Sequence, residues 1–351
     1  MKESHTSLLL LVCVTAATAG LLAFPETIST SVSDALALCA NILLPTLFPF
    51  MILSGFIVKS GLAHFLGEKA GWFMPVIFHL PGVCFAPLLL GILGGYPTGA
   101  KTLVNLYNSG ACSKRDAEHT LAFCSNCGPG FLISSIGFGM FGAIRYGIFL
   151  YAVHIIAAFL CGIIFAPPEK PVIRTASISR GTNTSVSSAF VGSVCDALPA
   201  FLNLCSFVLC FSAIVPLFLV SEIPALLASP LPFSGSNGQW FLLGLLEMTA
   251  GIRHLTAGTL GEKLVLTAVL AAWGGLSVHC QVISLLRDTG LSARFYWRGK
   301  LLHAALSALL ICLSVVPIPT ADTMTLIFLA APFSFLLFLK KRSGNTHKNV
   351  L

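Results

Sequence analysis

The chain has 351 residues, of which 56% are hydrophobic and only 9% are charged, and its mean hydropathy is +0.90. Soluble domains carry about a quarter charged residues, so this composition excludes an ordinary soluble protein. The formal net charge of +7 comes from Lys and Arg in short loops and in the C-terminal tail. That placement is typical of membrane topology signals and does not indicate a nucleic-acid partner. We therefore expect an integral membrane protein in contact with membrane lipid.

Apolar stretches long enough to cross a bilayer, about 20 residues of helix each, recur along the whole chain. They predict an all-α protein with about eight transmembrane helices, at 8–24, 35–58, 118–140, 146–165, 189–220, 264–286, 301–316 and 324–339. We interpret the first as an uncleaved span, although Ala17-Thr18-Ala19 resembles a signal-peptide cleavage site. Residues 72–107 are interrupted by Pro and Gly, and 239–253 are too short to cross, so two re-entrant helical segments are expected there.

Positive charge in short loops marks the cytoplasmic side of a membrane protein. The basic segments are Lys2, 59–69, 114–115, 170–180, 287–300 and 340–348. All of them fall on one side if both re-entrant segments return to the side that they enter from. A full crossing by 239–253 would instead put the basic tail outside. We therefore expect a multi-pass protein of a bacterial cytoplasmic membrane with both termini in the cytoplasm.

An internal repeat is indicated by SVSDALALCAN at 31–41 and SVCDALPAFLN at 193–203, which are identical at six of eleven positions. LLGIL at 89–93 matches LLGLL at 242–246, and 122–134 match 272–284 in the same order. Arg145 and His154 likewise match Arg294 and His303. The predicted organisation is an N-terminal helix at 1–30, a first repeat at 31–166, a cytoplasmic linker at 167–188, a second repeat at 189–317 and a C-terminal helix with a basic tail at 318–351.

The two predicted repeats should have inverted topology. Each contains three full spans and one re-entrant segment, and an odd number of crossings turns the second copy over. Inverted repeats with broken helices are an architecture of secondary transporters, whose site lies near the membrane midplane where the repeats meet. Irregular backbone is tolerated at that depth only where protein encloses it or where it lines a water-filled cavity.

Four breaks in the apolar pattern, at 94–99, 126–130, 247–251 and 274–281, occupy corresponding places in the two halves. Unwound turns offer backbone donors, acceptors and helix-end dipoles, which suits a small polar solute or an ion. The candidate binding residues are Gly95, Tyr96, Pro97, Thr98, Ser125, Asn126, Gly128, Pro129, Glu247, Thr249, Ser277, His279 and Gln281.

Glu247 is the main candidate for ion coupling, because a carboxylate within FLLGLLEMTAG is costly at membrane depth. The alternatives are a glutamate at the membrane boundary or one paired with Arg253. His279 either titrates or packs as a hydrogen-bonded histidine. The candidate Ser, Asn and Gln residues either hold a substrate or join helices by hydrogen bonds.

Other polar residues have structural interpretations. We expect Asp34 and Asp196 to cap the first helix of each repeat. Arg145, Arg294 and His154 are expected to anchor the chain at the membrane interface, and Lys101 to extend its ammonium to the cytoplasmic surface.

The sequence gives little indication of catalysis or metal binding. Most of the 12 cysteines lie in apolar runs, where a thiol behaves as a small hydrophobe. The pair Cys124 and Cys127 lacks the further ligands of a zinc site, although a metal or redox role stays open. The common nucleotide-binding, hydrolase and metalloprotease motifs do not occur. We therefore expect no metal, no cofactor and no enzyme activity.

GILGGYPTGAK at 91–101, followed by AFCSNCGPG at 122–130, resembles the sporulation integral membrane protein YlbJ family. GLLEMTAGI and GGLSVHCQV downstream are similar to the second half of that family. The family belongs with proteins that carry the nucleoside-recognition, or Gate, domain, as do spore maturation proteins and the membrane part of ferrous iron transport protein B. The resemblance implies a protein of spore formation and maturation with a transporter-like pair of Gate repeats. It does not imply a nucleoside substrate.

The function expected from these observations is movement of a small polar solute or ion across a bacterial membrane during sporulation. The alternative is a membrane scaffold or assembly factor that transports nothing and acts through a second copy of the chain or through other sporulation membrane proteins. A membrane-embedded enzyme acting on lipid has less support.

Overall fold

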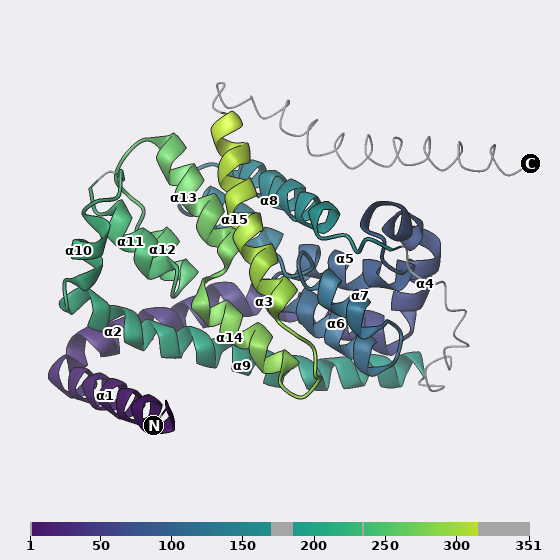
Figure 1. Ribbon diagram of the computed structural model, residues 1–351, viewed down its shortest axis with the longest axis horizontal. Coiled ribbons are helices and arrows are strands. Elements are labelled where there is room, and N and C mark those ends of the chain that lie inside the picture. Colours follow the sequence, from purple (N-terminus) through teal and green to yellow (C-terminus); the bar gives the residue numbers. More distant parts are fainter. Residues whose placement is uncertain (1, 170–184, 234, 315–351) are drawn as a thin grey trace, which may run out of the picture.

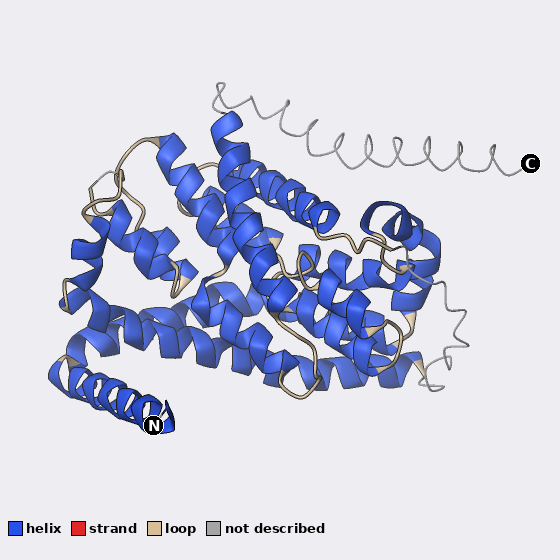
Figure 2. Cartoon of the chain, in the orientation of Figure 1, coloured by secondary structure: helices blue, strands red, loops and turns tan. Residues whose placement is uncertain are grey.

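The computed structural model describes residues 2–169, 185–233 and 235–314, and all regular elements in these ranges are helical (Figure 1, Figure 2). In chain order they are α1 (Lys2–Ala23), α2 (Pro25–Leu38), the π-helix η1 (Cys39–Leu43), α3 (Leu44–Lys59), α4 (Leu62–Ala70), the short helices η2 (Gly71–Phe73), η3 (Met74–Phe78) and η4 (Gly82–Cys84), α5 (Phe85–Gly94), α6 (Thr98–Asn108), α7 (Lys114–Thr120), the π-helix η5 (Gly130–Phe138), α8 (Ile144–Ile164), α9 (Val186–Val220), α10 (Ile223–Ala228), α11 (Asn237–Gly244), α12 (Met248–Arg253), α13 (Leu260–Trp273), α14 (Gly275–Leu286) and α15 (Arg294–Leu313). The all-α prediction is thus confirmed for the described residues. The predicted span 324–339 lies outside them.

Three stretches are long and apolar enough to cross a membrane: Ile144–Ile164, Val186–Val220 and Leu260–Leu286. Two bent pairs of helices raise the number to five within the described ranges, Pro25–Leu43 with Leu47–Ile57 and Gly71–Phe78 with Gly82–Gly94. The first pair bends by 53° and the second by 102°. Length and composition make the chain an integral membrane protein, while the count of eight spans stays a prediction.

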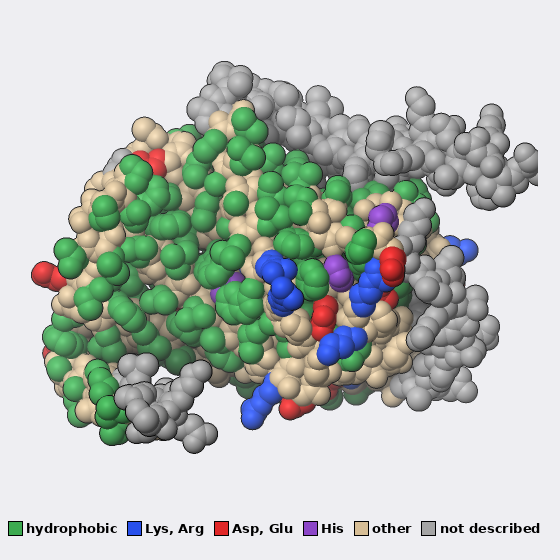
Figure 3. All heavy atoms as spheres, viewed as in Figure 1, with side chains coloured by type: hydrophobic (Ala, Val, Ile, Leu, Met, Phe, Trp, Pro, Cys, Tyr) green, Lys and Arg blue, Asp and Glu red, His purple; other side chains and the backbone are tan. Residues whose placement is uncertain are grey.

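The long helices expose hydrophobic side chains on their outer surface, where a soluble protein would carry polar ones. α9 buries Phe201 yet leaves Phe190 and Leu202 more than half exposed. Hydrophobic side chains cover most of the face drawn in Figure 3, and charged side chains gather over one part of it, around α7 and the first turns of α15. A helix that is hydrophobic on all sides is typical of a membrane span, so the exposed apolar surface is expected to face lipid.

The bent element α2–η1–α3 packs antiparallel to α9. Ser31 near its start donates a hydrogen bond to the carbonyl oxygen of Ser212 near the end of α9, with an oxygen–oxygen distance of 2.7 Å. Phe56 near its end packs against Phe190 at the start of α9, with ring centroids 6.1 Å apart. These two elements carry the two copies of the SVxDAL sequence. The copies therefore run in opposite directions.

The prediction that Asp34 and Asp196 cap helices is wrong. α2 begins at Pro25 and α9 begins at Val186, so both aspartates lie inside helices. Asp196 instead forms an ion pair with Lys59, and the nitrogen–oxygen distance is 2.7 Å. This pair joins the end of α3 to the first third of α9.

Residues 118–140 do not form the single continuous helix that was predicted as a complete span. α7 ends at Thr120, and η5 begins only at Gly130. The intervening stretch holds Gly128 and Pro129, and Pro cannot donate the backbone hydrogen bond that a continuous helix requires. The break was predicted at 126–130, and the structure extends it back to residue 121.

The start of the last described helix was also predicted wrongly. Lys300 was assigned to a basic cytoplasmic loop at 287–300, but α15 begins at Arg294 and contains it. Lys300 is 1% exposed. It lies in the interior of the molecule and contributes no charge to a loop.

Each stretch that was expected to re-enter contains a pair of short helices that fold back on each other, α5 with α6 in the first and α11 with α12 in the second. Gly91 in α5 and Gly99 in α6 are eight positions apart, yet a Cβ atom on Gly99 would lie 2.9 Å from the Cα atom of Gly91. In the second half, a Cβ atom on Gly244 in α11 would lie 3.2 Å from the Cα atom of Gly251 in α12. Contacts so close are open only to glycine, and they require the chain to reverse between the paired residues.

Substitution of Gly91 tests the packing of the first hairpin. A Cβ atom at Gly91 would collide with the carbonyl oxygen of Cys124, which is backbone and cannot rotate away. We expect Gly91→Ala to lower the free energy of unfolding by about 1–3 kcal/mol. Gly261→Ala is the matched control, because a Cβ atom there meets only the Thr259 hydroxyl at 3.9 Å. Thermal unfolding in detergent that ranked the two variants equal would contradict the packing described.

Candidate functional site

The two breaks of the second half hydrogen-bond to each other. Between α11 and α12 the chain leaves the carbonyl groups of Leu245 and Leu246 without helical partners. The backbone amides of Leu276 and Ser277, in the first turn of α14, donate to these carbonyls at 2.9 and 3.0 Å. Lipid cannot supply such partners, so this mutual pairing allows both breaks to lie at membrane depth.

Each half also contains a glycine that brings its two breaks into contact. Gly95 has a φ of +72°, and a Cβ atom there would lie 2.9 Å from the amide nitrogen of Gly128. Gly275 has a φ of +77°, and a Cβ atom there would lie 2.9 Å from the amide nitrogen of Met248. Both the backbone conformation and the close approach require glycine. The same local construction thus occurs in both halves.

Two side chains from outside the first-half breaks satisfy backbone groups within them. His154 in α8 accepts a hydrogen bond at Nε2 from the amide of Cys127, at 2.9 Å. The Lys300 ammonium donates to the carbonyl oxygen of Ser125 at 3.1 Å and to the hydroxyl of Tyr96. The prediction that His154 anchors the chain at the membrane interface is therefore wrong, because its side chain is buried and supports a helix break.

Lys300 is the main site residue that sequence analysis missed. Its ammonium lies over the Tyr96 ring, 4.4 Å from the ring centre, and forms no ion pair with a carboxylate within the described ranges. It reaches across the molecule, since Tyr96 and Ser125 belong to the first half and α15 to the second. Helical spacing could have revealed it, because Tyr296, Lys300, His303 and Ser307 recur at intervals of three or four and are all buried.

Glu247 is buried between α11 and α12 and acts as the N-cap of α12. Its carboxylate accepts hydrogen bonds from the amides of Thr249 and Ala250 at 3.2 and 2.7 Å, and from the Thr249 hydroxyl. An ion pair with Arg253, one of the expected alternatives, is absent from the described contacts. The carboxylate is 2% exposed, so the protein holds a buried acid whose only described partners are neutral donors.

The breaks surround a cavity of about 50 Å³. That volume holds a few water molecules or a small ion, whereas drug-sized ligands occupy pockets of at least about 300 Å³. A nucleoside therefore does not fit this conformation. The lining residues are Leu43, Leu47, Gly95, Tyr96, Cys127, Gly128, Phe131, Leu204, Val208, Glu247, Met248, Thr249, Ser277, Val278 and Gln281.

The cavity lining takes matching positions from the two halves. The alignment that pairs 122–134 with 272–284 places Cys127 opposite Ser277 and Phe131 opposite Gln281, and all four line the cavity. The remaining walls come from the middle of α3 with η1 and the middle of α9. If the predicted repeat is correct, the cavity is lined by equivalent residues of its two copies.

Seven of the thirteen predicted binding residues line this cavity. They are Gly95, Tyr96, Gly128, Glu247, Thr249, Ser277 and Gln281. The Tyr96 hydroxyl donates a hydrogen bond to the carbonyl oxygen of Ala271 at 2.9 Å. The Gln281 side-chain oxygen is buried and has no hydrogen-bond partner in the described part of the chain, so it adds an unsatisfied acceptor to the region of the cavity.

The other six predicted residues lie behind the cavity or away from it. Pro97 follows Tyr96 through a cis peptide bond, and Thr98 donates to the carbonyl of Gly94. Pro129 precedes η5. The hydroxyl of Ser125 and the side-chain oxygen of Asn126 are buried and unpartnered, close to the carbonyl that Lys300 binds.

His279 belongs to a different environment. Its Nδ1 atom lies 2.8 Å from the Tyr296 hydroxyl, and its ring packs against Trp273 and Trp297 with centroids 4.3 and 4.4 Å apart. The structure therefore does not bring His279 together with Glu247 on the cavity wall. These contacts correspond to the second of the two roles expected for His279, that of a hydrogen-bonded histidine that packs between helices.

The eleven cysteines whose side chains are described, among them Cys124 and Cys127, are free thiols. Within residues 2–169, 185–233 and 235–314, no cluster of three or more His, Cys, Asp or Glu side chains is arranged to hold a metal ion. The prediction of no metal or cofactor stays a prediction.

The helical breaks and the cavity between them define an integral membrane protein with a broken-helix centre. Residues 40–144 match the family model Gate, described as nucleoside recognition. The chain is also similar to the sporulation integral membrane protein YlbJ of Bacillus subtilis (strain 168), with 24% identity over 335 residues that cover 87% of this chain and 81% of the relative. These two matches confirm the resemblance seen in the sequence motifs. No solved structure matches the chain.

Substitution of Lys300 separates its charge from its volume. Lys300→Met keeps most of the side-chain volume but leaves the Ser125 carbonyl oxygen without its donor, so we expect it to lower the free energy of unfolding by about 1–3 kcal/mol. Lys300→Ala removes the same donor and also leaves a cavity, so it should be less stable than Lys300→Met by about 2 kcal/mol or more. Thermal unfolding in detergent measures both. A Lys300→Met variant as stable as the unmodified chain would contradict the role of the ammonium as a partner for the helix break.

The capping role of Glu247 predicts a graded loss of stability. Glu247→Ala removes the acceptor of two amides and should cost about 1 kcal/mol, whereas Glu247→Gln keeps one acceptor oxygen and should cost less. Glu68→Ala, on the exposed face of α4, is the control and should change stability by less than about 0.5 kcal/mol. The measurement is thermal unfolding in detergent. An order in which Gln is worse than Ala would be incompatible with capping.

Proposed function

We propose that the chain moves a small polar solute or ion across the membrane through the cavity between its two halves. The observation that carries this proposal is the meeting of all four helix breaks around one space that holds a buried carboxylate, Glu247. Broken helices at the junction of two repeats form the substrate and ion sites of secondary transporters. A purely structural core would be expected to fill this space with side chains.

The proposed architecture consists of two inverted repeats, at 31–166 and 189–317, with helices at both ends of the chain. It has eight spans and two re-entrant hairpins, and both termini are cytoplasmic. The antiparallel packing of α2–α3 against α9 supports opposite orientation of the two copies. The matched glycine contacts at Gly95 and Gly275 support their common origin.

Alternating access in this architecture would move one half against the other around the cavity. The contacts that join the halves would then have to change during transport. Lys300 is one of these contacts, because it links α15 to the Tyr96 break of the first half. Glu247 is the proposed coupling group, because an ion or proton that binds its carboxylate competes with the amides that it caps.

A role in sporulation is proposed from the similarity to YlbJ, a relative named as a sporulation integral membrane protein. We propose that the chain works without catalysis in a bacterial cytoplasmic membrane. The second candidate is a scaffold or assembly factor that keeps the Gate architecture and binds a second copy or other sporulation membrane proteins. The observation that most favours the scaffold is the small volume of the cavity, about 50 Å³, which leaves little room for a solute.

Reconstituted protein distinguishes the two functions. Liposomes that contain the purified chain should show proton-dependent or solute-dependent flux across a panel of small polar solutes and ions. Glu247→Gln should abolish flux while the protein still folds, and Glu68→Gln on the α4 surface should leave flux unchanged. If no member of the panel either moves or raises the unfolding temperature, the transport proposal fails and the scaffold stands.

A further inference from the structure

A second depression in the molecule lies outside the central site, between α14 and the start of α15. It has a volume of about 380 Å³ and is open along one side. Most of its lining is one stripe of α14, at Leu276, His279, Cys280, Ile283 and Ser284, with Arg287 at the end of the helix. These positions recur at intervals of three or four, so they share one face of the helix.

The length of this groove matches one leaflet of a bilayer. The stripe begins one residue after the Gly275 break and ends at Arg287, which corresponds to about 16 Å at 1.5 Å per residue. The hydrocarbon of one leaflet is about 15 Å thick. Leu276 and Ile283 are 37% and 38% exposed, although they belong to the apolar stretch Leu260–Leu286. An acyl chain fits the length and the chemistry of the stripe.

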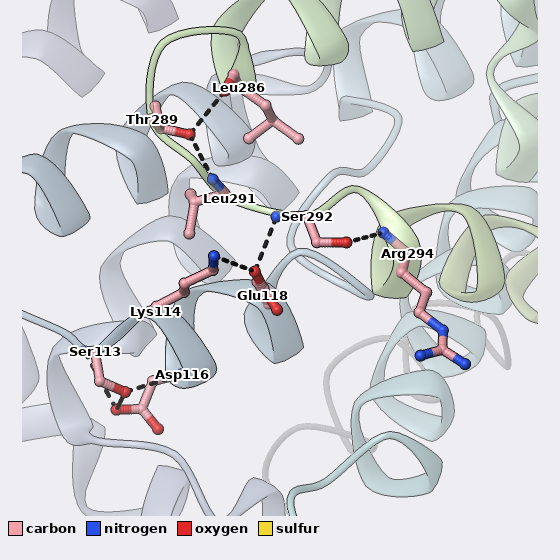
Figure 4. A network of polar contacts seen from close by, with 9 residues as sticks. All are labelled: Ser113, Lys114, Asp116, Glu118, Leu286, Thr289, Leu291, Ser292 and Arg294. Carbon is pink, nitrogen blue, oxygen red and sulfur yellow. Dashed lines mark hydrogen bonds and ion pairs between the residues drawn. The ribbon is translucent and has the colours of Figure 1, made fainter.

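Arg287 lines the end of the groove, and two further arginines, Arg294 and Arg298, lie in the first turns of α15, the helix that supplies Trp297 to the groove wall. The guanidinium groups of Arg287, Arg294 and Arg298 form no hydrogen bond or ion pair with any described residue. In Figure 4, the backbone amide of Arg294 donates a hydrogen bond to the Ser292 hydroxyl, while the Arg294 guanidinium contacts none of the residues drawn. The Glu118 carboxylate is already paired with the Lys114 ammonium and accepts a hydrogen bond from the Ser292 amide. Asp288, the carboxylate next to Arg287 in the sequence, also forms no ion pair with a described residue.

The wall of the groove is rigid, because aromatic side chains hold it. Trp297 from α15 and His279 from α14 both line the groove. The ring of His279 packs between Trp273 and Trp297, and its Nδ1 atom contacts the Tyr296 hydroxyl. The indole nitrogen of Trp297 has no described hydrogen-bond partner, and tryptophan is enriched at the level of lipid headgroups. A preformed wall avoids the entropy cost of ordering side chains when a ligand binds.

We propose that this groove is a binding site for one anionic phospholipid. An acyl chain lies along the α14 stripe, and the phosphate lies at Arg287 with Arg298 close to Trp297. Basic pockets between membrane helices bind anionic headgroups in this way, and each arginine near the surface strengthens binding about five-fold. The site is distinct from the central cavity and does not depend on transport.

The test uses the full chain purified in detergent, titrated with dioleoyl phosphatidylglycerol or dioleoyl phosphatidylcholine. We expect phosphatidylglycerol to raise the unfolding temperature and to stay bound as a single lipid in native mass spectrometry. The double variant Arg287→Gln and Arg298→Gln should bind it about 25-fold more weakly. Ser284→Trp should block binding by filling the groove while all the arginines remain. Lys69→Gln, an exposed basic residue at the end of α4, is the control and should match the unmodified chain.

Equal binding of the two lipids would overturn the proposal, because the arginines would then not select an anionic headgroup. So would selective binding of phosphatidylglycerol that survives both the arginine double variant and Ser284→Trp, because the lipid would then lie elsewhere. If the double variant fails to fold, Ser284→Trp alone decides the outcome, since it leaves every charge in place. None of these measurements requires flux, so they stand apart from the transport experiment.

Discussion

Backbone groups freed at a helix break cannot be satisfied by lipid, and the rest of this structure follows from that constraint. In the second half, the carbonyls of Leu245 and Leu246 accept hydrogen bonds from the first turn of α14. In the first half, Lys300 and His154 supply the partners for the break around Ser125 and Cys127. Each break therefore needs a neighbour at a fixed position. This requirement draws the hairpins and the broken helices together around one small space.

The space at the centre has the properties expected of a functional site more than those of a packed core. Glu247, Ser277 and Gln281 line it from one half, while Gly95 and Tyr96 line it from the other. Several buried polar atoms in this part of the protein, including the side-chain oxygens of Asn126 and Gln281, have no hydrogen-bond partner among the described residues. Unsatisfied buried groups cost free energy, so packing alone does not account for these polar side chains.

The sequence predicted the positions of the breaks well, because Pro and Gly interrupt helices through local chemistry that needs no tertiary context. It predicted Glu247, Ser277 and Gln281 at the cavity for the same reason. The sequence did not reveal the buried position of Lys300, because this lysine follows three arginines and was assigned with them to a basic loop. In the structure, the neighbouring Gly299 packs closely against the backbone of Ala122, and this contact draws Lys300 into the interior. Nor did the sequence reveal the role of His154, because a histidine in an apolar helix gives no local sign of the backbone group that it supports.

The orientation of the two halves tests the central claim most directly. In a cysteine-free variant, single cysteines at the exposed positions Asn108 and Thr256 mark the loops that follow the first and the second hairpin. If the halves are inverted, a membrane-impermeant thiol reagent labels Thr256→Cys in intact cells, and it reaches Asn108→Cys only after the membrane is opened. Labelling of both positions from the same side would contradict inversion, and the shared cavity would then need another explanation.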